Sequence, residues 1–210
     1  MMSCVESNPP VPSAAPVVLR ASELAQCLQA GSAVVFPTDT LPALAASPDH
    51  AGQIWQLKQR PADKPLILMA ADLEQLRDVL GQPWHSEWLQ VARAVWPGAV
   101  TLVLPASGAW ATALHPGGGS LGVRIPASEQ ARGLLRCSGP LATTSANHSG
   151  EPAATTAAEA AILFPTVPQL EPVPWPPATG VASTVLGWSE AGWRVLRAGA
   201  SLPAGLNLLR

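Results

Sequence analysis

Short apolar runs and amphipathic stretches follow one another along most of this chain, and this pattern predicts alternating strands and helices. A compact apolar run that is bounded by glycine, proline or polar residues suits a buried strand. We expect such strands at residues 33–36, 66–69, 100–104, 122–125, 141–144, 181–186 and 193–196. The last two are joined by a turn through 187–192. The alternation predicts an α/β fold.

Helical spacing of apolar residues predicts helices at 22–30, 49–59, 72–80, 86–96, 128–136 and 156–164. Ser22 is the expected cap of the first helix, and Gly31 lies just past its end. Gly81 closes the third helix and Pro97 ends the fourth. Residues 165–177 hold so many prolines that we expect a stiff excursion there, without regular structure.

The composition supports one folded domain and excludes several functional classes. The chain has 210 residues, of which 48% are hydrophobic, so it is long enough to bury a substantial core. Only 12% are charged, and the formal net charge of −2 excludes a generic basic coat for nucleic acid. The longest uncharged stretch, 94–123, is interrupted by prolines and glycines, so it is not expected to span a membrane.

The N-terminus and the cysteines indicate where the protein works. Residues 1–16 carry neither a basic nor an apolar signal region, so we expect a disordered tail there and a single domain over 17–210. Cys4, Cys27 and Cys137 are widely spaced, and the four histidines show no metal-ligand spacing. We therefore predict no disulfide framework, no bound metal, and a reducing, cytoplasmic location.

The chain has only two lysines, Lys58 and Lys64, and both lie in one short segment with Arg60 between them. Three cations within seven residues repel one another unless an anion offsets their charge. Lysine offers phosphate a compact point charge, and arginine holds two oxygens at once. The alternative is a solvated basic turn at the end of a helix, where cations also suit the helix dipole.

Hydroxyl and amide side chains gather in a turn after the strand at 141–144. Ser145 and Asn147 lie in this turn, which could direct backbone N–H groups and hydroxyls at phosphate oxygens. The segment matches neither a P-loop nor a dinucleotide fingerprint, and an ordinary Asx or Ser/Thr turn is the alternative. Weaker candidates stand at other strand ends, namely Thr38, Thr40, Arg124, Ser183 and Arg197.

Seven short blocks of this sequence, taken in order, resemble the YrdC-like family. They are P-T-D-T (37–40), K-Q-R-P-A-D-K-P-L (58–66), W-P-G-A-V-T (96–101), V-R-I-P (123–126), T-S-A-N-H-S-G (144–150), A-S-T-V (182–185) and L-R-A-G-A (196–200). The resemblance implies an open, twisted mixed β-sheet flanked by helices around a deep, positively charged cleft. Its best known members are threonylcarbamoyl-AMP synthases, and this chain resembles their short form, which lacks an extra C-terminal domain.

The resemblance also implies a reaction. Such enzymes convert L-threonine, bicarbonate and ATP with Mg²⁺ into threonylcarbamoyl-adenylate and pyrophosphate. The product then serves the t6A modification at position 37 of tRNA, through downstream transferase machinery. By the family pattern Lys58 and Arg60 are catalytic cations that hold carboxylate and phosphate groups. ATP binding falls to Lys64, Arg124, Ser145, Asn147, Ser183 and Arg197, and threonine binding to Thr38 and Thr40.

The chain departs from the family pattern at a few positions. Many relatives read P-T-D-T-V-Y-G-L where this chain has Pro42 and Ala43 in place of the tyrosine and glycine. Ala99 replaces a proline, and Ala182 and Gly187 stand where acids often flank S-T-V. The lost ring and hydroxyl remove a wall or a hydrogen bond of the threonine pocket.

Two other functions fit the same residues. A divergent paralogue could bind nucleotide or RNA, either double-stranded RNA or tRNA, without making the adenylate. The low overall charge weakens the RNA version, because phosphate binding requires several Lys or Arg. Carbamoyl transfer is the other alternative, as in larger carbamoyltransferases with a similar domain.

Overall fold

The computed structural model describes residues 16–61, 63–201, 204–206 and 208–209. The tail predicted for residues 1–16 lies outside this range except for Pro16. The α-helices are α1 (Ala21–Gln29), α2 (Gly52–Lys58), α3 (Ser86–Val95), α4 (Ala109–Leu114), α5 (Glu129–Ser138) and α6 (Ala157–Leu163), with a short 3-10 helix at Pro48–His50. No helix within the described ranges is both long and apolar enough to cross a bilayer.

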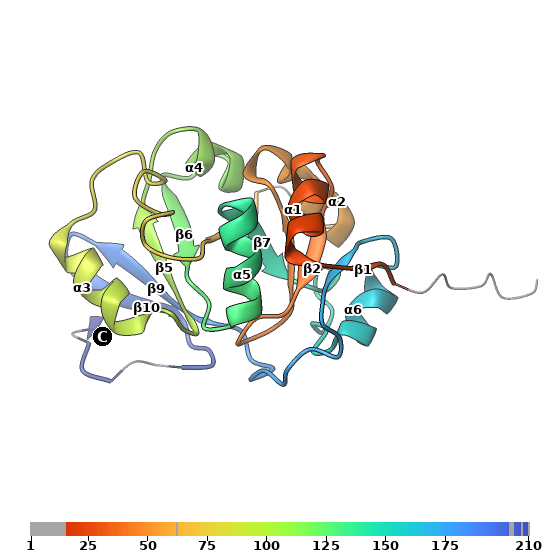
Figure 1. Ribbon diagram of the computed structural model, residues 1–210. Helices are drawn as coiled ribbons and strands as arrows, with labels where there is room; N and C mark the ends of the chain where they lie inside the picture. Colours follow the sequence, from red (N-terminus) through yellow and green to blue (C-terminus); the bar gives the residue numbers. More distant parts are fainter. Residues whose placement is uncertain (1–15, 62, 202–203, 207, 210) are drawn as a thin grey trace, which may run out of the picture.

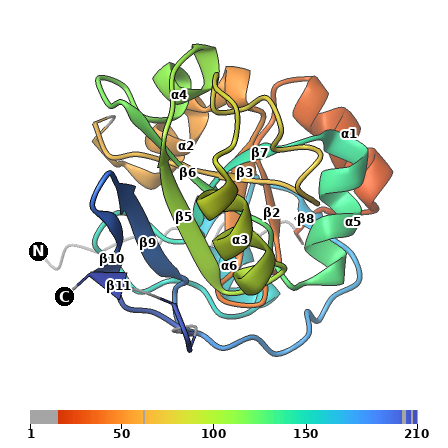
Figure 2. The ribbon, with the colours of Figure 1, turned by 90° about the vertical axis from the view of Figure 1, so that its left-hand side faces the viewer.

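The described strands form a single mixed sheet, in the order β1-β8-β2-β3-β7-β4-β6-β5-β9-β10-β11 (Figures 1 and 2). Their bounds are β1 Val18–Leu19, β2 Val34–Phe36, β3 Ala43–Ala46, β4 Ile67–Met69, β5 Val100–Pro105, β6 Ser120–Arg124, β7 Leu141–Ser145, β8 Gln169–Leu170, β9 Thr184–Ser189, β10 Gly192–Arg197 and β11 Leu208–Leu209. β4 runs parallel to β6 and antiparallel to β7, and β5 runs antiparallel to β6 and parallel to β9. The predicted open, mixed α/β sheet is confirmed.

The core divides into two clusters. In the larger one, α2, α3, α4 and α6 pack with central strands that contribute Leu68, Leu102 and Val123. In the smaller one, α1 and α5 lie side by side and cover β2, β3 and β7 (Figures 1 and 2). Neighbouring residues on the central strands point to the opposite face of the sheet. That face is free to line a pocket.

The structure shows how two of the predicted helices begin. Ser128 is the N-cap of α5, and its hydroxyl accepts a hydrogen bond from the backbone N–H of Ala131 at 3.3 Å. The predicted cap of α1 was wrong. Arg20 is the N-cap, and Glu23 accepts a hydrogen bond from the Arg20 backbone N–H at 2.9 Å, so the helix begins at Ala21, before Ser22.

The helix predicted at residues 72–80 does not form. The segment is a series of turns, although its apolar residues have helical spacing. Its backbone N–H groups bond to carbonyls three residues earlier, as from Leu76 to Leu73 and from Arg77 to Glu74, so successive turns form in place of an α-helix. The Asp72 carboxylate accepts from Gln75 N–H, and the Gln75 amide joins Ala71 to Leu135 of α5.

Sequence patterns missed β3 and α4 and misjudged the proline-rich segment. β3 consists of three alanines and a leucine, which favour helix by propensity. It becomes a strand because it is fully buried between β2 and β7. Within 165–177, Gln169 and Leu170 form β8, which pairs with β1 and β2, so the segment is not entirely irregular.

Candidate functional site

A pocket of about 490 Å³ lies against one face of the central strands. Its floor is a row of residues paired directly across four neighbouring strands: Thr143, Ile67, Gly122 and Val103. Polar groups surround this mostly apolar floor: Thr38, Thr40, Arg60, Thr101, His115, Ser120, Arg124, Thr144, Ser145, Ser183 and Arg197. Among the described residues, no carboxylate belongs to the lining.

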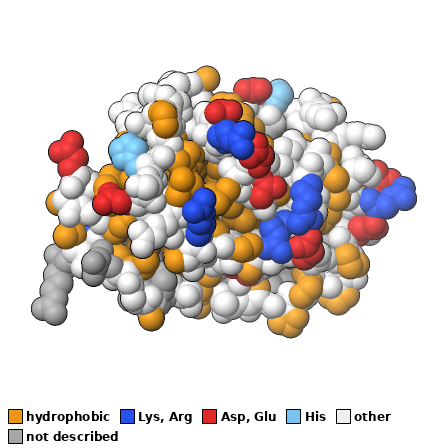
Figure 3. Space-filling model, turned by 60° about the vertical axis from the view of Figure 1, so that its left-hand side comes forward, with side chains coloured by type: hydrophobic (Ala, Val, Ile, Leu, Met, Phe, Trp, Pro, Cys, Tyr) orange, Lys and Arg blue, Asp and Glu red, His pale blue; other side chains and the backbone are white. Residues whose placement is uncertain are grey.

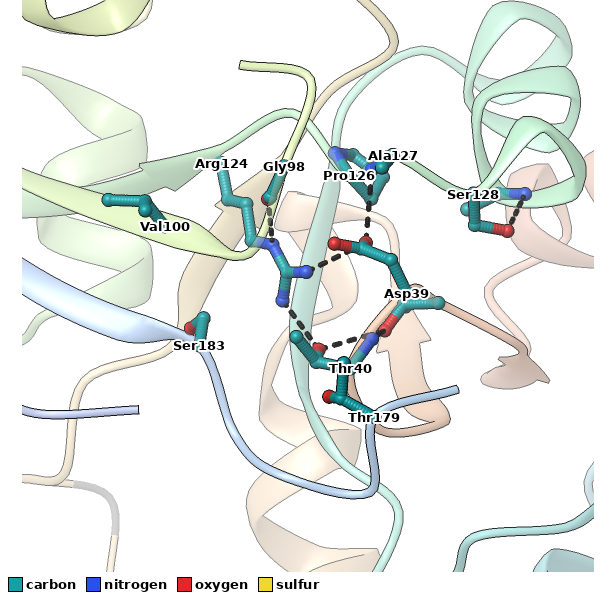
Figure 4. A network of polar contacts seen from close by, with 12 residues as sticks. Asp39, Thr40, Gly98, Val100, Arg124, Pro126, Ala127, Ser128, Thr179 and Ser183 are labelled. Atoms are coloured by element: carbon teal, nitrogen blue, oxygen red, sulfur yellow. Dashed lines mark hydrogen bonds and ion pairs between the residues drawn. The ribbon is translucent and has the colours of Figure 1, made fainter. Parts of the chain in front are cut away.

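Arg124 stands at the end of β6, where the P-T-D-T loop crosses it (Figure 4). Its side chain forms an ion pair with Asp39 at 2.8 Å, and only 5% of it is exposed. Burial lowers the pKa of the Arg124 guanidinium, and the nearby Asp39 carboxylate opposes that shift. Arginine stays charged nonetheless, so the pair puts a fixed and partly neutralised cation at one end of the pocket.

Lys58 is almost completely buried, with 2% of its surface exposed. Its Nζ donates hydrogen bonds to the carbonyl oxygens of Ser145 and Asn147, both at 2.6 Å, and to Asn147 Oδ1 at 2.7 Å. The Lys58 carbonyl accepts a fourth bond, from Ser149 N–H at 2.9 Å. Lys58 therefore ties the end of α2 to the turn after β7.

The burial of Lys58 has an electrostatic consequence. Loss of hydration lowers the pKa of its ammonium to about 8, and the like charge of Arg60 acts in the same direction. An ammonium has three N–H donors, and all three are used here. A neutral amine would have only two.

Arg60 reaches the pocket because the chain reverses directly before it. Gln59 adopts a left-handed conformation, with φ of 51°, and ends α2. The Arg60 guanidinium donates to the Pro65 carbonyl at 3.1 Å and contacts Thr144 Oγ1 at 3.4 Å. Its Nε is buried without a partner. Burial lowers the pKa of the guanidinium.

A second wall of the pocket joins β5, β9 and β10. The hydroxyls of Thr101 and Ser183 lie 2.8 Å apart, and both are buried. Arg197 Nη2 donates to the Ser183 carbonyl at 2.8 Å, and burial lowers the pKa of its guanidinium. Neither Arg60 nor Arg197 forms an ion pair with a carboxylate of the described chain.

The structure brings together most of the residues that the sequence singled out. Seven of them line the pocket: Thr38, Thr40, Arg60, Arg124, Ser145, Ser183 and Arg197. Lys58 and Asn147 lie behind the lining, where they hold each other and the Ser145 hydroxyl. Lys64 is exposed and outside the lining. Pro42 and Ala43, the departures from the family pattern, do line the pocket.

Sequence reasoning missed the floor of the pocket and one of its ends. His115, one of the four histidines without metal-ligand spacing, joins the lining beside Ser120. Its Nδ1 lies 3.0 Å from the Ser120 carbonyl. The floor was hidden because its residues lie within short, largely apolar runs of the central strands, so no alternation of polar and apolar residues marked a separate pocket face. Within the described chain, no group of three or more His, Cys, Asp or Glu residues could hold a metal.

Comparison with known proteins places this geometry in context. The family model described as "Telomere recombination", for Sua5, YciO and YrdC proteins, matches residues 26–199. The threonylcarbamoyl-AMP synthase of Pyrococcus abyssi is 40% identical over 134 residues, which cover 62% of this chain and 39% of that protein. The synthase of Stenotrophomonas maltophilia is 40% identical over 135 residues, which cover 60% of this chain and 71% of that protein.

A solved structure shows the same fold. The crystal structure of P. abyssi Sua5 complexed with L-threonine is similar, with a TM-score of 0.78 and 34% identity. The alignment covers 87% of this chain and 56% of that one. The chain thus spans well under two thirds of the length of the P. abyssi relative.

Proposed function

Because the chain belongs to the Sua5, YciO and YrdC family, we propose that it is a threonylcarbamoyl-AMP synthase. Its substrates are L-threonine, bicarbonate and ATP, and its products are threonylcarbamoyl-adenylate and pyrophosphate. One observation carries the proposal: Arg60, Arg124 and Arg197 converge on one pocket whose described lining contains no carboxylate. The names of the relatives and the threonine complex of the P. abyssi protein support the choice of substrates.

The proposed reaction develops negative charge that the site must stabilise. The threonine nitrogen attacks the carbon of bicarbonate, and loss of water leaves a carbamate. A carbamate oxygen then attacks the α-phosphorus of ATP, the bond to the bridging oxygen breaks, and pyrophosphate leaves. Negative charge gathers on carbamate and phosphate oxygens in the transition state, so fixed cations and N–H donors stabilise it.

The three arginines differ in whether a carboxylate already pairs with them, and their proposed roles follow from this difference. Arg124 is already paired with Asp39, so it acts as an oriented donor. Arg60 and Arg197 have no carboxylate partner in the described chain, and their charge is available for the polyphosphate. Mg²⁺ enters as part of the substrate, bound to the phosphates of ATP.

The proposed product also implies what consumes it. A mixed anhydride of carbamate and phosphate is an activated acyl donor, and we propose that downstream transferase machinery uses it for t6A at position 37 of tRNA. We therefore place the reaction in the cytoplasm. Rescue of a strain that lacks its own synthase, scored by t6A in its tRNA, tests this step.

The direct test is release of pyrophosphate from ATP. We expect a rate that requires both L-threonine and bicarbonate, together with a product of the mass of threonylcarbamoyl-adenylate. ATP consumption that ignores threonine would refute the proposal. On the face of the molecule in Figure 3, acidic side chains lie among the basic ones, an arrangement that suits a small anionic ligand better than an RNA backbone. Binding of labelled tRNA at low salt without adenylate formation would favour the RNA-binding alternative.

A further inference from the structure

The guanidinium of Arg124 is held on three sides before any ligand binds (Figure 4). Its Nε donates to the Gly98 carbonyl at 3.0 Å, Nη1 to Thr40 Oγ1 at 2.8 Å, and Nη2 to Asp39 Oδ1 at 2.8 Å. A guanidinium has five N–H groups, so two remain for a ligand. The residue is 4% exposed and belongs to the pocket lining.

The donor and acceptor roles of the hydroxyl groups behind Arg124 follow from a count of their hydrogens. Thr38 gives its only hydroxyl hydrogen to the Leu41 carbonyl at 2.7 Å. In the 3.0 Å contact between the two threonine hydroxyls, Thr40 must therefore be the donor. Thr38 also accepts from the Thr40 backbone N–H at 3.1 Å, which uses its second lone pair.

This order leaves neither threonine with a hydroxyl hydrogen for a substrate, although Thr40 keeps one lone pair that can accept. The Thr38 hydroxyl makes one donated and two accepted bonds, so it is saturated. The Thr40 hydroxyl gives its hydrogen to Thr38 and accepts from Arg124, so it has no hydrogen left to donate. Both side chains are buried.

The remaining contacts fix the loop against β6. Asp39 Oδ1 also accepts from the backbone N–H of Ala127 at 3.0 Å. Gly98 donates its N–H to the Ile125 carbonyl at 2.9 Å, and a Cβ at Gly98 would lie 2.5 Å from the Val95 carbonyl oxygen. Only glycine therefore fits at this position, where the backbone carbonyl accepts from Arg124.

We propose that Thr38, Asp39 and Thr40 are positioning residues for Arg124, and that neither threonine hydroxyl donates a hydrogen bond to the amino-acid substrate. The chain of bonds runs from Arg124 through Thr40 to Thr38 and ends at the Leu41 carbonyl. It holds the guanidinium in one orientation, so its two free N–H groups meet the ligand without rearrangement. The kinetic test of this inference rests on the proposed function.

The kinetic test is a double-mutant cycle. Thr40→Val removes the hydroxyl at nearly constant shape, and we expect it to lower kcat/KM for threonine-dependent pyrophosphate release about 10- to 100-fold, since the bond is to a charged group. Thr40→Ser should restore most of the rate. In an Arg124→Lys background, Thr40→Val should cause less than a twofold further loss. An equal loss in both backgrounds would mean that Thr40 touches the substrate itself, and would overturn the proposal.

A second measurement does not depend on activity. In protein labelled with ¹⁵N-arginine, Arg124 should give separate Nη–H signals, identified by their loss in Arg124→Lys, because three bonds stop its rotation. Thr40→Val and Thr38→Val should broaden or merge these signals, while the exposed Thr112→Val on α4 leaves them unchanged. Unchanged signals in the first two variants would overturn the positioning role. If the wild type releases no pyrophosphate, the proposed function fails and this test still stands.

Discussion

Lys58 Nζ lies 2.7 Å from Asn147 Oδ1, although the two residues are 89 positions apart in the chain. The same oxygen accepts a hydrogen bond from the Ser145 hydroxyl, also at 2.7 Å. One buried cation thus fixes the backbone of the turn and the Asn147 amide, which in turn holds the Ser145 hydroxyl at the pocket. The lysine that the sequence marks as a catalytic cation is placed to act through the turn.

Replacing Lys58 by methionine tests whether this lysine holds the turn after β7 or only supplies positive charge. Lys58→Met keeps most of the side-chain volume but leaves three acceptors without their donor. We expect it to lower the free energy of unfolding by about 1–3 kcal/mol. We also expect it to raise KM for ATP roughly tenfold or more, because the turn loosens.

Lys64→Met is the matched control, since Lys64 is exposed and outside the pocket lining. Its stability should change by less than about 0.5 kcal/mol. Urea unfolding of the three proteins measures the difference. Equal stabilities for the two variants would contradict the structural role of Lys58.

The pKa of Lys58 predicts that activity falls at high pH while stability does not. Above about pH 8 the ammonium loses a proton, and one of its three bonds with it, so kcat/KM should fall with an apparent pKa near 8. Stability should not fall with it. Between about 8 and the ordinary value of 10.5, the unfolded chain binds more protons than the folded one. The contribution of Lys58 to the free energy of unfolding therefore rises over this range.

Urea unfolding at each pH of the rate profile tests this separation. A rate that stays constant up to pH 10 would contradict the prediction. So would a loss of activity that tracks unfolding.

The two arginines without carboxylate partners should matter most for the polyphosphate. We expect Arg60→Gln and Arg197→Gln each to reduce kcat/KM for ATP by roughly 10²- to 10³-fold, because each removes a fixed cation and N–H donors from the transition state. Arg136→Gln is the control, since Arg136 pairs with Glu129 on the surface of α5. Initial rates over a range of ATP concentrations measure the effect. Losses no larger than that of the control would argue against phosphate binding between these arginines.

Gly122 offers a steric test of the pocket floor. A Cβ built there would lie 3.5 Å from Ile67 Cγ1 and from Thr101 Cγ2, which is ordinary contact. We expect Gly122→Ala to fold with stability equal to the wild type or up to about 1 kcal/mol higher, because a glycine inside a strand weakens it.

Gly122→Leu should fold as well but fill the floor, so ATP binding measured by calorimetry should weaken about 100-fold or more. Equal binding by the alanine and leucine variants would show that no ligand rests on this row of residues.

Much of the fold was determined by the sequence because its signals are local. Ser128 forms a cap with a backbone N–H three residues away, and Pro97 follows Trp96, the C-cap of α3. The buried runs that became β2, β4, β5, β6 and β7 were short, apolar and bounded by breakers. The P-T-D-T, K-Q-R-P and S-A-N blocks likewise identified the family and four polar residues of the pocket, namely Thr38, Thr40, Arg60 and Ser145.

Tertiary structure decided what local signals could not contain. β3 is a strand because two neighbours pair with it, against the helix propensity of its alanines. The segment 72–80 forms turns whose N–H groups bond to carbonyls three residues earlier, and the Gln75 amide ties it to Leu135 of α5. The positions of the two cations were decided in the same way. Lys58 lies behind the pocket because the turn at Ser145 and Asn147 supplies acceptors for its ammonium. Arg60 lines the pocket because Gln59 reverses the chain directly before it. Hydrogen bonds and burial depend on partners far along the chain, so only the folded protein assigns a cation to the ligand or to the scaffold.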